Sequence, residues 1–128
     1  MTDENEIRSY RDLRVWNEAM ELAADCYRMT TSFPRDEMFG MTAQIRRAGA
    51  SIPANIAEGY GRDSTGNYVQ FLKTAQGSLK ELETHVLLAA KVGLVPQERS
   101  APLLERAETV GKMLRGLMRS IRPTGGQA

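Results

Sequence analysis

The sequence predicts an all-α protein that folds as an antiparallel, up-down-up-down four-helix bundle. Three observations support this class: apolar residues recur at helical spacing in four segments, strand-like alternation is weak, and only short turn-rich stretches separate the segments. Four amphipathic helices with short connections are typical of such a bundle. Three helices with one loose segment is the alternative, but all four helical patterns are strong.

The first helix is expected over residues 12–31. Asp12 is expected to be its N-cap, because a carboxylate can accept a free backbone N–H at a helix start. Charged residues lie opposite the apolar face, and the stretch "SFPRDE" ends the helix and turns the chain. The apolar face comprises Trp16, Ala19, Met20, Ala23, Cys26, Tyr27 and Thr30.

The second helix is expected over residues 35–60 and contains most of "RRAGASIPANIAEGYG", whose proline and glycines are unusual in a helix. Pro53 cannot bond to the carbonyl of Gly49, which predicts a kink. A helical projection shows three stripes instead of two. The apolar stripe is Met38, Met41, Ile45, Ile52 and Ile56; the small-residue stripe is Ala43, Ala50, Ala54, Ala57 and Gly61.

The third stripe of this helix is polar and lies beside the apolar one. Half-buried polar groups need partners, since an unpaired one costs about 1–3 kcal/mol. Small residues let another backbone come close, and a helix in a four-helix monomer has neighbours on two sides only. A third contact therefore predicts another copy of the chain. The polar stripe is Gln44, Arg47, Ser51, Asn55, Glu58 and Arg62.

The third and fourth helices are expected over residues 64–92 and 97–121. Each carries apolar residues in alternating steps of four and three, the heptad spacing of nearly antiparallel neighbours. Ser64 is expected to cap the third helix and Gly93 to end it, because glycine accepts left-handed geometry. The bundle then covers residues 10–122, between flexible tails at 1–9 and 123–128.

The end of the third helix, "VLLAAKVG", is apolar well beyond its heptad seam. Leu87, Leu88 and Val92 join the seam residues there. Extra apolar surface on a small domain often marks an interface, although these residues could instead widen the core. Together with the third face of the second helix, this pattern favours self-association.

Composition bounds the functional classes. The chain has 128 residues, a formal net charge of +1 and one cysteine. The near-neutral charge gives no global field toward nucleic acid or membrane, and the single cysteine excludes an internal disulfide. The start resembles no signal peptide, and no apolar run reaches the ~18 residues of a membrane span. We expect a cytoplasmic protein with no membrane partner.

No catalytic constellation is recognisable, so no enzyme activity, cofactor, metal or small-molecule substrate is expected. His85 with Glu81 one turn earlier would supply only two metal ligands. Cys26 has no histidine near it in sequence and lies on an apolar face. The glycine-rich "GYGRDSTG" lacks both the Gly-Lys-Ser/Thr ending of a phosphate-binding loop and the strand that precedes a dinucleotide-binding one.

A basic stripe on the last helix is the one binding signal. Its members, opposite the apolar seam, are Lys112, Arg115, Arg119 and Arg122, which could follow the phosphates of RNA or DNA. The alternative is helix stabilisation: acids early and bases late complement the helix dipole, and Glu108 with Lys112 would form an i,i+4 pair. No aromatic residue interleaves with the cations, so base stacking is not indicated.

Four stretches carry a family resemblance that spans roughly residues 10–121. They are "YRDLRVWNEAMELA" (10–23), "FPRDEMFGMTAQIRRAGASIPANIAEGYGR" (33–62), "FLKTAQGSLKELETHVLLA" (71–89) and "KMLRGLMRSI" (112–121). The chain resembles the bacterial four helix bundle protein family, whose first members are encoded in intervening sequences of large-subunit ribosomal RNA genes. More distantly it resembles the accessory proteins of diversity-generating retroelements, pentameric bundles that work with a reverse transcriptase and nucleic acid.

The resemblance implies an antiparallel four-helix bundle that assembles as a homopentamer, hence a ring-like homo-oligomer. It also implies a polar network between the second and third helices, or between subunits, in which Arg46 or Arg47 pairs with Glu81. The family positions matched here are Gln44, Arg46, Arg47, Ser51, Asn55, Glu58, Gly59, Ser78, Glu81 and Glu83. Two functional classes follow from the sequence: a nucleic-acid-binding protein and a protein-interaction scaffold.

Overall fold

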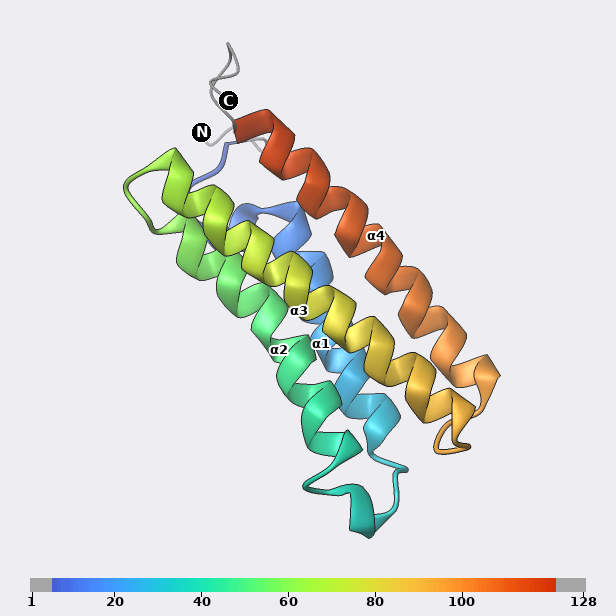
Figure 1. The fold of residues 1–128 in the computed structure, drawn as a ribbon. Helices are drawn as coiled ribbons and strands as arrows, with labels where there is room; N and C mark the ends of the chain where they lie inside the picture. Colours follow the sequence, from blue (N-terminus) through green and yellow to red (C-terminus); the bar gives the residue numbers. More distant parts are fainter. Residues whose placement is uncertain (1–5, 122–128) are drawn as a thin grey trace.

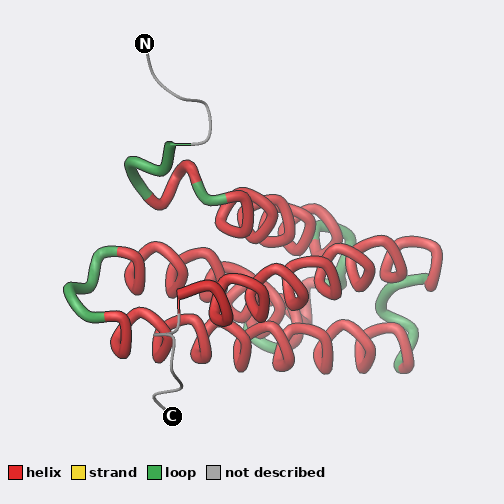
Figure 2. The backbone as a smooth tube through the Cα atoms, turned by 90° about the horizontal axis from the view of Figure 1, so that it is seen from above, coloured by secondary structure: helices red, strands yellow, loops and turns green. Residues whose placement is uncertain are grey.

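The computed structural model describes residues 6–121, which contain four long α-helices and no strand. These are α1 (Arg14–Thr30), α2 (Met41–Tyr60), α3 (Thr65–Lys91) and α4 (Gln97–Ile121), with short 3-10 turns η1 (Tyr10–Asp12) and η2 (Arg35–Glu37) before the first two. Figure 1 shows the helices side by side, and each packs on two others in the cyclic order α1, α2, α3, α4. Figure 2 shows the connections gathered at the ends of the helices. The arrangement is that of a four-helix bundle.

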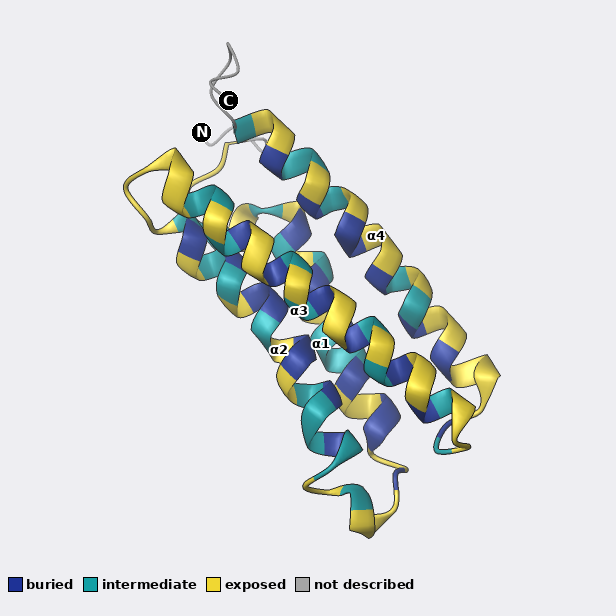
Figure 3. Ribbon diagram, viewed as in Figure 1, coloured by how far each residue is buried: buried dark blue, intermediate teal, exposed yellow. Residues whose placement is uncertain are grey.

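The heptad seams of α3 and α4 form much of the core, as predicted. Burying a leucine or valine side chain stabilises a fold by about 1.5–3 kcal/mol, so the seam is a large favourable term. Figure 3 shows the buried stripe on the inner side of each helix. The fully buried seam residues are Leu72, Ala75, Leu79, Leu82, Val86, Ala89, Ala107, Val110 and Leu114.

The predicted ends of α3 are confirmed. The Ser64 hydroxyl accepts a hydrogen bond from the backbone N–H of Asn67 at 3.1 Å. Gly93 has a φ of +84°. The N–H groups of Gly93 and Leu94 donate to the carbonyls of Ala90 and Ala89 at 3.1 and 2.9 Å, which closes the last turn in the paired pattern of a Schellman motif.

The predicted start of the first helix is wrong. Helix α1 begins at Arg14, and its N-cap, Leu13, makes no side-chain cap bond. Asp12 belongs to η1, where its carboxylate accepts the backbone N–H groups of Arg8 and Ser9 at 2.8 and 3.1 Å. Ser9 and Asp12 therefore form a reciprocal capping box one turn too early to cap α1.

The second helix also starts later than predicted, at Met41 instead of residue 35. Residues 35–37 form η2, and Gly40 leaves helical geometry with φ −106° and ψ −114°. Met38, predicted to belong to the apolar stripe, has an exposed side chain because it precedes the helix. Past this start, α2 runs through Pro53 to Tyr60 as one helix.

Two glycines of α2 allow its close contact with both neighbours. A Cβ on Gly49 would lie 2.9 Å from Cys26 Sγ on α1, and one on Gly59 would lie 2.7 Å from Phe71 Cβ on α3. Both distances are shorter than real carbon contacts allow. Gly49 and Gly59 of the unusual stretch are thus required by packing, because a side chain at either position would push the helices apart.

Candidate nucleic-acid interface and apolar groove

The predicted basic stripe lies on the outer surface of α4. Lys112, Arg115 and Arg119 are exposed, while the adjacent seam residues Val110 and Leu114 are buried. Within residues 6–121 none of the three cations joins an ion pair, and the predicted bond between Glu108 and Lys112 is not formed. Arg122 lies outside the described residues. Three unpaired positive charges therefore follow one another along about two turns of helix.

Other cations of the chain are held by acidic partners. Arg106 on α4 bonds to Asp25 of α1 at 3.0 Å and to Glu18 at 3.4 Å, which ties the two helices together. Lys80 bonds to Glu83 at 3.0 Å within α3. Cations elsewhere on α3 and α4 therefore form ion pairs with nearby carboxylates, whereas the three cations of the stripe do not within the described chain.

Part of the expected polar set is joined between α2 and α3. The hydroxyl oxygens of Ser51 and Ser78 lie 2.7 Å apart. The side-chain amide of Asn55 donates to the Ser51 hydroxyl at 3.1 Å and to the Ser51 carbonyl at 2.8 Å. Three half-buried polar side chains thus satisfy one another at this helix contact.

The remaining members of the set lie apart from this network. Arg47, Glu58 and Glu81 are exposed and Gln44 is half-buried. Glu58 bonds to Arg62 at 3.0 Å, and Glu81 lies 3.5 Å from the imidazole of His85. The predicted pairing of Glu81 with Arg46 or Arg47 does not occur within the described chain.

Arg46 instead binds the C-terminal end of α1. Its Nε donates to the Thr30 hydroxyl at 2.8 Å and its Nη2 to the Tyr27 carbonyl at 3.4 Å. The guanidinium carbon also lies 4.6 Å from the centre of the Tyr27 ring. A cation at a helix C-terminus is favourable because the free carbonyls there carry partial negative charge. The sequence pattern on α2 alone gave no sign of this partner on α1.

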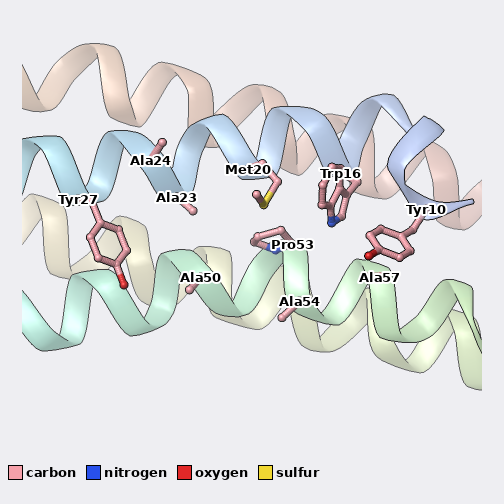
Figure 4. A pocket seen from close by; sticks show the side chains of 10 residues that line it. All are labelled: Tyr10, Trp16, Met20, Ala23, Ala24, Tyr27, Ala50, Pro53, Ala54 and Ala57. Atoms are coloured by element: carbon pink, nitrogen blue, oxygen red, sulfur yellow. The ribbon is translucent and has the colours of Figure 1, made fainter.

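An apolar groove of about 450 Å³ runs between α1 and α2. Figure 4 shows aromatic and methionine side chains of α1 opposite Pro53 and the alanines of α2, with Tyr10 at one end. The apolar face predicted for α1 is therefore only partly buried: Met20 is 44% exposed and Tyr27 50% exposed. The residues lining the groove are Tyr10, Trp16, Met20, Ala23, Ala24, Tyr27, Ala50, Pro53, Ala54 and Ala57.

Three members of the small-residue stripe of α2, Ala50, Ala54 and Ala57, line this groove. Ala50 and Ala54 are exposed, so their size is not required by packing within the chain. The sequence pattern identified the stripe but missed that Tyr10 and Trp16 close the groove, with their rings 5.2 Å apart in an edge-to-face contact. These exposed positions leave room for a further contact on α2, and the contact with another copy stays a prediction.

The extra apolar residues of α3 do not widen the core. Leu87, Leu88 and Val92 are 57%, 43% and 61% exposed. The interpretation that these residues of "VLLAAKVG" widen the core is therefore wrong. They lie on the surface, around the end of α3.

Cys26 is fully buried on the inner side of α1. Burial, with a smaller contribution from the charge of Asp25, raises the pKa of its thiol to about 12. A neutral, enclosed thiol is a poor nucleophile. No helix within residues 6–121 is long and apolar enough to cross a membrane.

Comparisons with known proteins place the chain in a family. No curated protein matches it. A solved structure from Bacteroides thetaiotaomicron, a protein of unknown function from the S23 ribosomal protein family, matches with a TM-score of 0.74 and 23% identity, over 82% of this chain and 98% of that one. At this identity the likeness shows a shared fold. The family model described as 23S rRNA-intervening sequence protein matches residues 11–116. The chain therefore belongs to the 23S rRNA-intervening sequence protein family.

Proposed function

We propose that this protein is a non-enzymatic helical bundle of the cytoplasm that self-associates and binds RNA or DNA without sequence preference along α4. In this proposal the bundle is antiparallel, up-down-up-down, and its copies form a ring-like homo-oligomer. The number five comes from the family resemblance alone. Phosphates are the ligand, since Lys112, Arg115 and Arg119 offer charge without an aromatic stacking platform.

The proposal of nucleic-acid binding is supported by the exposure of the basic stripe on α4 and by its lack of ion pairs in the described chain. Its three cations are exposed, share one helix face and join no ion pair within residues 6–121. Of the helix-stabilisation alternative, the pair of Glu108 with Lys112 is not formed in the described part of the chain, and the complement to the helix dipole does not occupy the side chains of the stripe. The stripe also lies on the second half of α4, away from the groove between α1 and α2, so assembly through the groove leaves it accessible.

Self-association is supported by the groove itself. On α2 the groove is lined by Ala50 and Ala54, which are exposed, so packing within the chain does not require small residues there. On α1 it is lined by the exposed side chains of Met20 and Tyr27. Contiguous apolar surface on a small domain commonly marks a site of contact with another molecule. A ring would repeat the stripe on each copy, and several weak phosphate contacts would then act together.

The test is RNA binding by nuclease-treated protein, followed by fluorescence anisotropy across a salt series. The variant changes Lys112, Arg115 and Arg119 together to Gln. Its control changes Arg14, Arg47 and Lys73 to Gln, which removes the same charge from exposed positions on other surfaces that join no ion pair within residues 6–121. We expect the wild-type affinity to fall steeply with salt, the stripe variant to bind at least tenfold more weakly with a flatter salt slope, and the control to resemble the wild type.

Equal losses in the two triple variants would show a general charge effect and would remove the stripe from the account. A folded protein that binds neither RNA nor DNA at low salt would leave the alternative, a structural scaffold whose partner is a protein. The apolar groove favours that alternative, because a helix of another protein would also fit between α1 and α2.

A further inference from the structure

Exposed apolar side chains concentrate at one end of the bundle. Among residues 6–121, eight large hydrophobic side chains are exposed, and five of them lie just before α2 or around the end of α3. Figure 1 shows the α1–α2 and α3–α4 connections at this same end. These five are Met38, Phe39, Leu87, Leu88 and Val92.

Phe39 is the most exposed of them, at 92%. The backbone around it is held in place: the N–H of Gly40 donates to the Glu37 carbonyl at 3.0 Å, and the N–H of Met41 donates to the Glu37 carboxylate at 3.0 Å. A phenylalanine fixed outward by its own backbone contacts presents a large apolar surface without the entropy cost of ordering a loose loop.

A hollow of about 480 Å³ lies between the end of α3 and the start of α4. Its lining is mainly apolar, from Leu87 and Ala90 on α3 and from Ala101 and Leu104 on α4. The polar residues that line it are Lys91, Gln97 and Ser100. It is large enough for an aromatic ring. Nothing in the described chain fills it.

The projection and the hollow cannot meet within one chain. The cyclic packing order places the α1–α2 side of the bundle opposite the α3–α4 side. Phe39 belongs to the first side and the hollow to the second, and both lie at the same end of the bundle. Two different surfaces on opposite sides and at the same end of the bundle are what a head-to-tail contact between copies requires. Such contacts form a ring when the rotation from copy to copy closes on itself.

Charges of both signs accompany the two surfaces. Arg35 and Asp36 are exposed and precede Phe39 in the sequence, Lys91 lines the hollow, and the exposed Glu98 follows Gln97, which also lines it. None of these four joins an ion pair within residues 6–121. Each surface thus has near it an unpaired charge of each sign that a charge of the other surface can pair, which favours a second copy of this chain over an apolar peptide as the occupant.

We infer that Phe39 of one copy inserts into the hollow between α3 and α4 of the next copy, with Leu87 and Leu104 around its ring. The inference rests on the proposed self-association and adds a second contact to that of the groove between α1 and α2. This contact joins two different surfaces instead of two identical ones, and without it the groove contact alone does not hold the copies together. The first half of α4 is then an assembly surface, and the basic stripe on its second half stays outside the contact.

The test uses two variants at exposed positions. Phe39→Glu removes the projection, and Ala101→Trp fills the hollow. Both side chains lie outside the core, so circular dichroism and melting should stay close to wild type. Ile7→Glu, at another exposed apolar residue, is the control. Masses are measured by light scattering at one protein concentration.

We expect each variant alone to fall to the mass of one chain, while Ile7→Glu keeps the wild-type mass. When the two variants are mixed, one intact hollow and one intact Phe39 remain, so the mixture should form a two-chain species and nothing larger. A wild-type oligomer whose mass Phe39→Glu leaves unchanged would overturn this contact but not self-association. Two dissociated variants that fail to combine would overturn the head-to-tail geometry. A wild-type protein of single-chain mass would remove the proposed assembly itself.

Discussion

The hydroxyl oxygens of Ser51 on α2 and Ser78 on α3 lie 2.7 Å apart, and the Asn55 amide donates to the same Ser51 hydroxyl at 3.1 Å. Helices α2 and α3 are thus joined by a small polar network beside their apolar contact. Its members are half-buried, so loss of a partner is only partly compensated by water.

Replacing Ser51 with Ala should lower the free energy of unfolding by about 1–2 kcal/mol, because Ser78 and Asn55 each lose a partner. Urea unfolding followed by circular dichroism measures this. The Ser51→Ala/Ser78→Ala double variant should lose less than the two single changes together, since the second change removes a hydroxyl that is already unpaired. Strictly additive losses would show that the two hydroxyls do not interact.

Gly59→Ala should destabilise the fold by about 1–3 kcal/mol, although alanine is the better helix former by about 1 kcal/mol. The new Cβ would lie 2.7 Å from Phe71 Cβ, so α2 and α3 would have to move apart. Gly77→Ala on α3 is the matched control, because a Cβ there meets nothing within 4 Å. We expect thermal melting to fall for the first variant and to rise slightly for the second. A rise in both would contradict the close approach at Gly59.

Arg46→Ala should lower the free energy of unfolding by about 1–2 kcal/mol, through loss of its bond to Thr30 and its contact with the Tyr27 ring. Arg46→Lys should recover only part of this, because an ammonium group cannot bond to both groups and cover the ring at once. Arg47→Ala, an exposed neighbour, is the control and should change stability little. Equal effects at the two positions in urea unfolding would contradict the assigned role of Arg46.

The buried thiol of Cys26 should lower the free energy of unfolding at high pH. Because its pKa is raised from 9.0 to about 12 in the folded chain, the fold favours the neutral thiol. This stabilisation is complete below pH 9 and is lost as pH rises from 9 toward 12. The free energy of unfolding of the wild type should therefore fall relative to that of Cys26→Ala across that range.

Burial of Cys26 also slows its reaction. Ellman's reagent at about pH 8, below the ordinary thiol pKa, should label the folded thiol far more slowly than the unfolded one. Rapid labelling of both would contradict its burial.

The four helices could be predicted because heptad spacing is a local, repeated signal. Leu72, Leu79 and Val86 recur along α3 where only an inward face explains them. The starts of α1 and α2 could not be predicted as well. Asp12 and Met38 lie in 3-10 turns or connections that resemble a first helical turn, and the backbone break at Gly40 has no one-dimensional signature.

The candidate surfaces were predictable to different degrees. The basic stripe follows from spacing on one helix, and its exposure agrees with that spacing. The groove depends on which side of α1 faces which side of α2. Periodicity therefore places Met20 and Tyr27 on the apolar face of α1 but does not show that they overhang the alanines of α2. The partner of Arg46 on α1 is likewise a contact between helices, which periodicity along either one does not contain.

The most direct measurement is the mass of the nuclease-treated wild-type protein by light scattering, over a range of concentrations and salt. Each chain has a mass of 14.2 kDa, so five copies would give five times 14.2, about 71 kDa. The account predicts an integral multiple of the chain mass that persists at high salt, because apolar surface holds the copies together. A mass of one chain under all conditions would contradict it, and the groove and Phe39 would then need another partner.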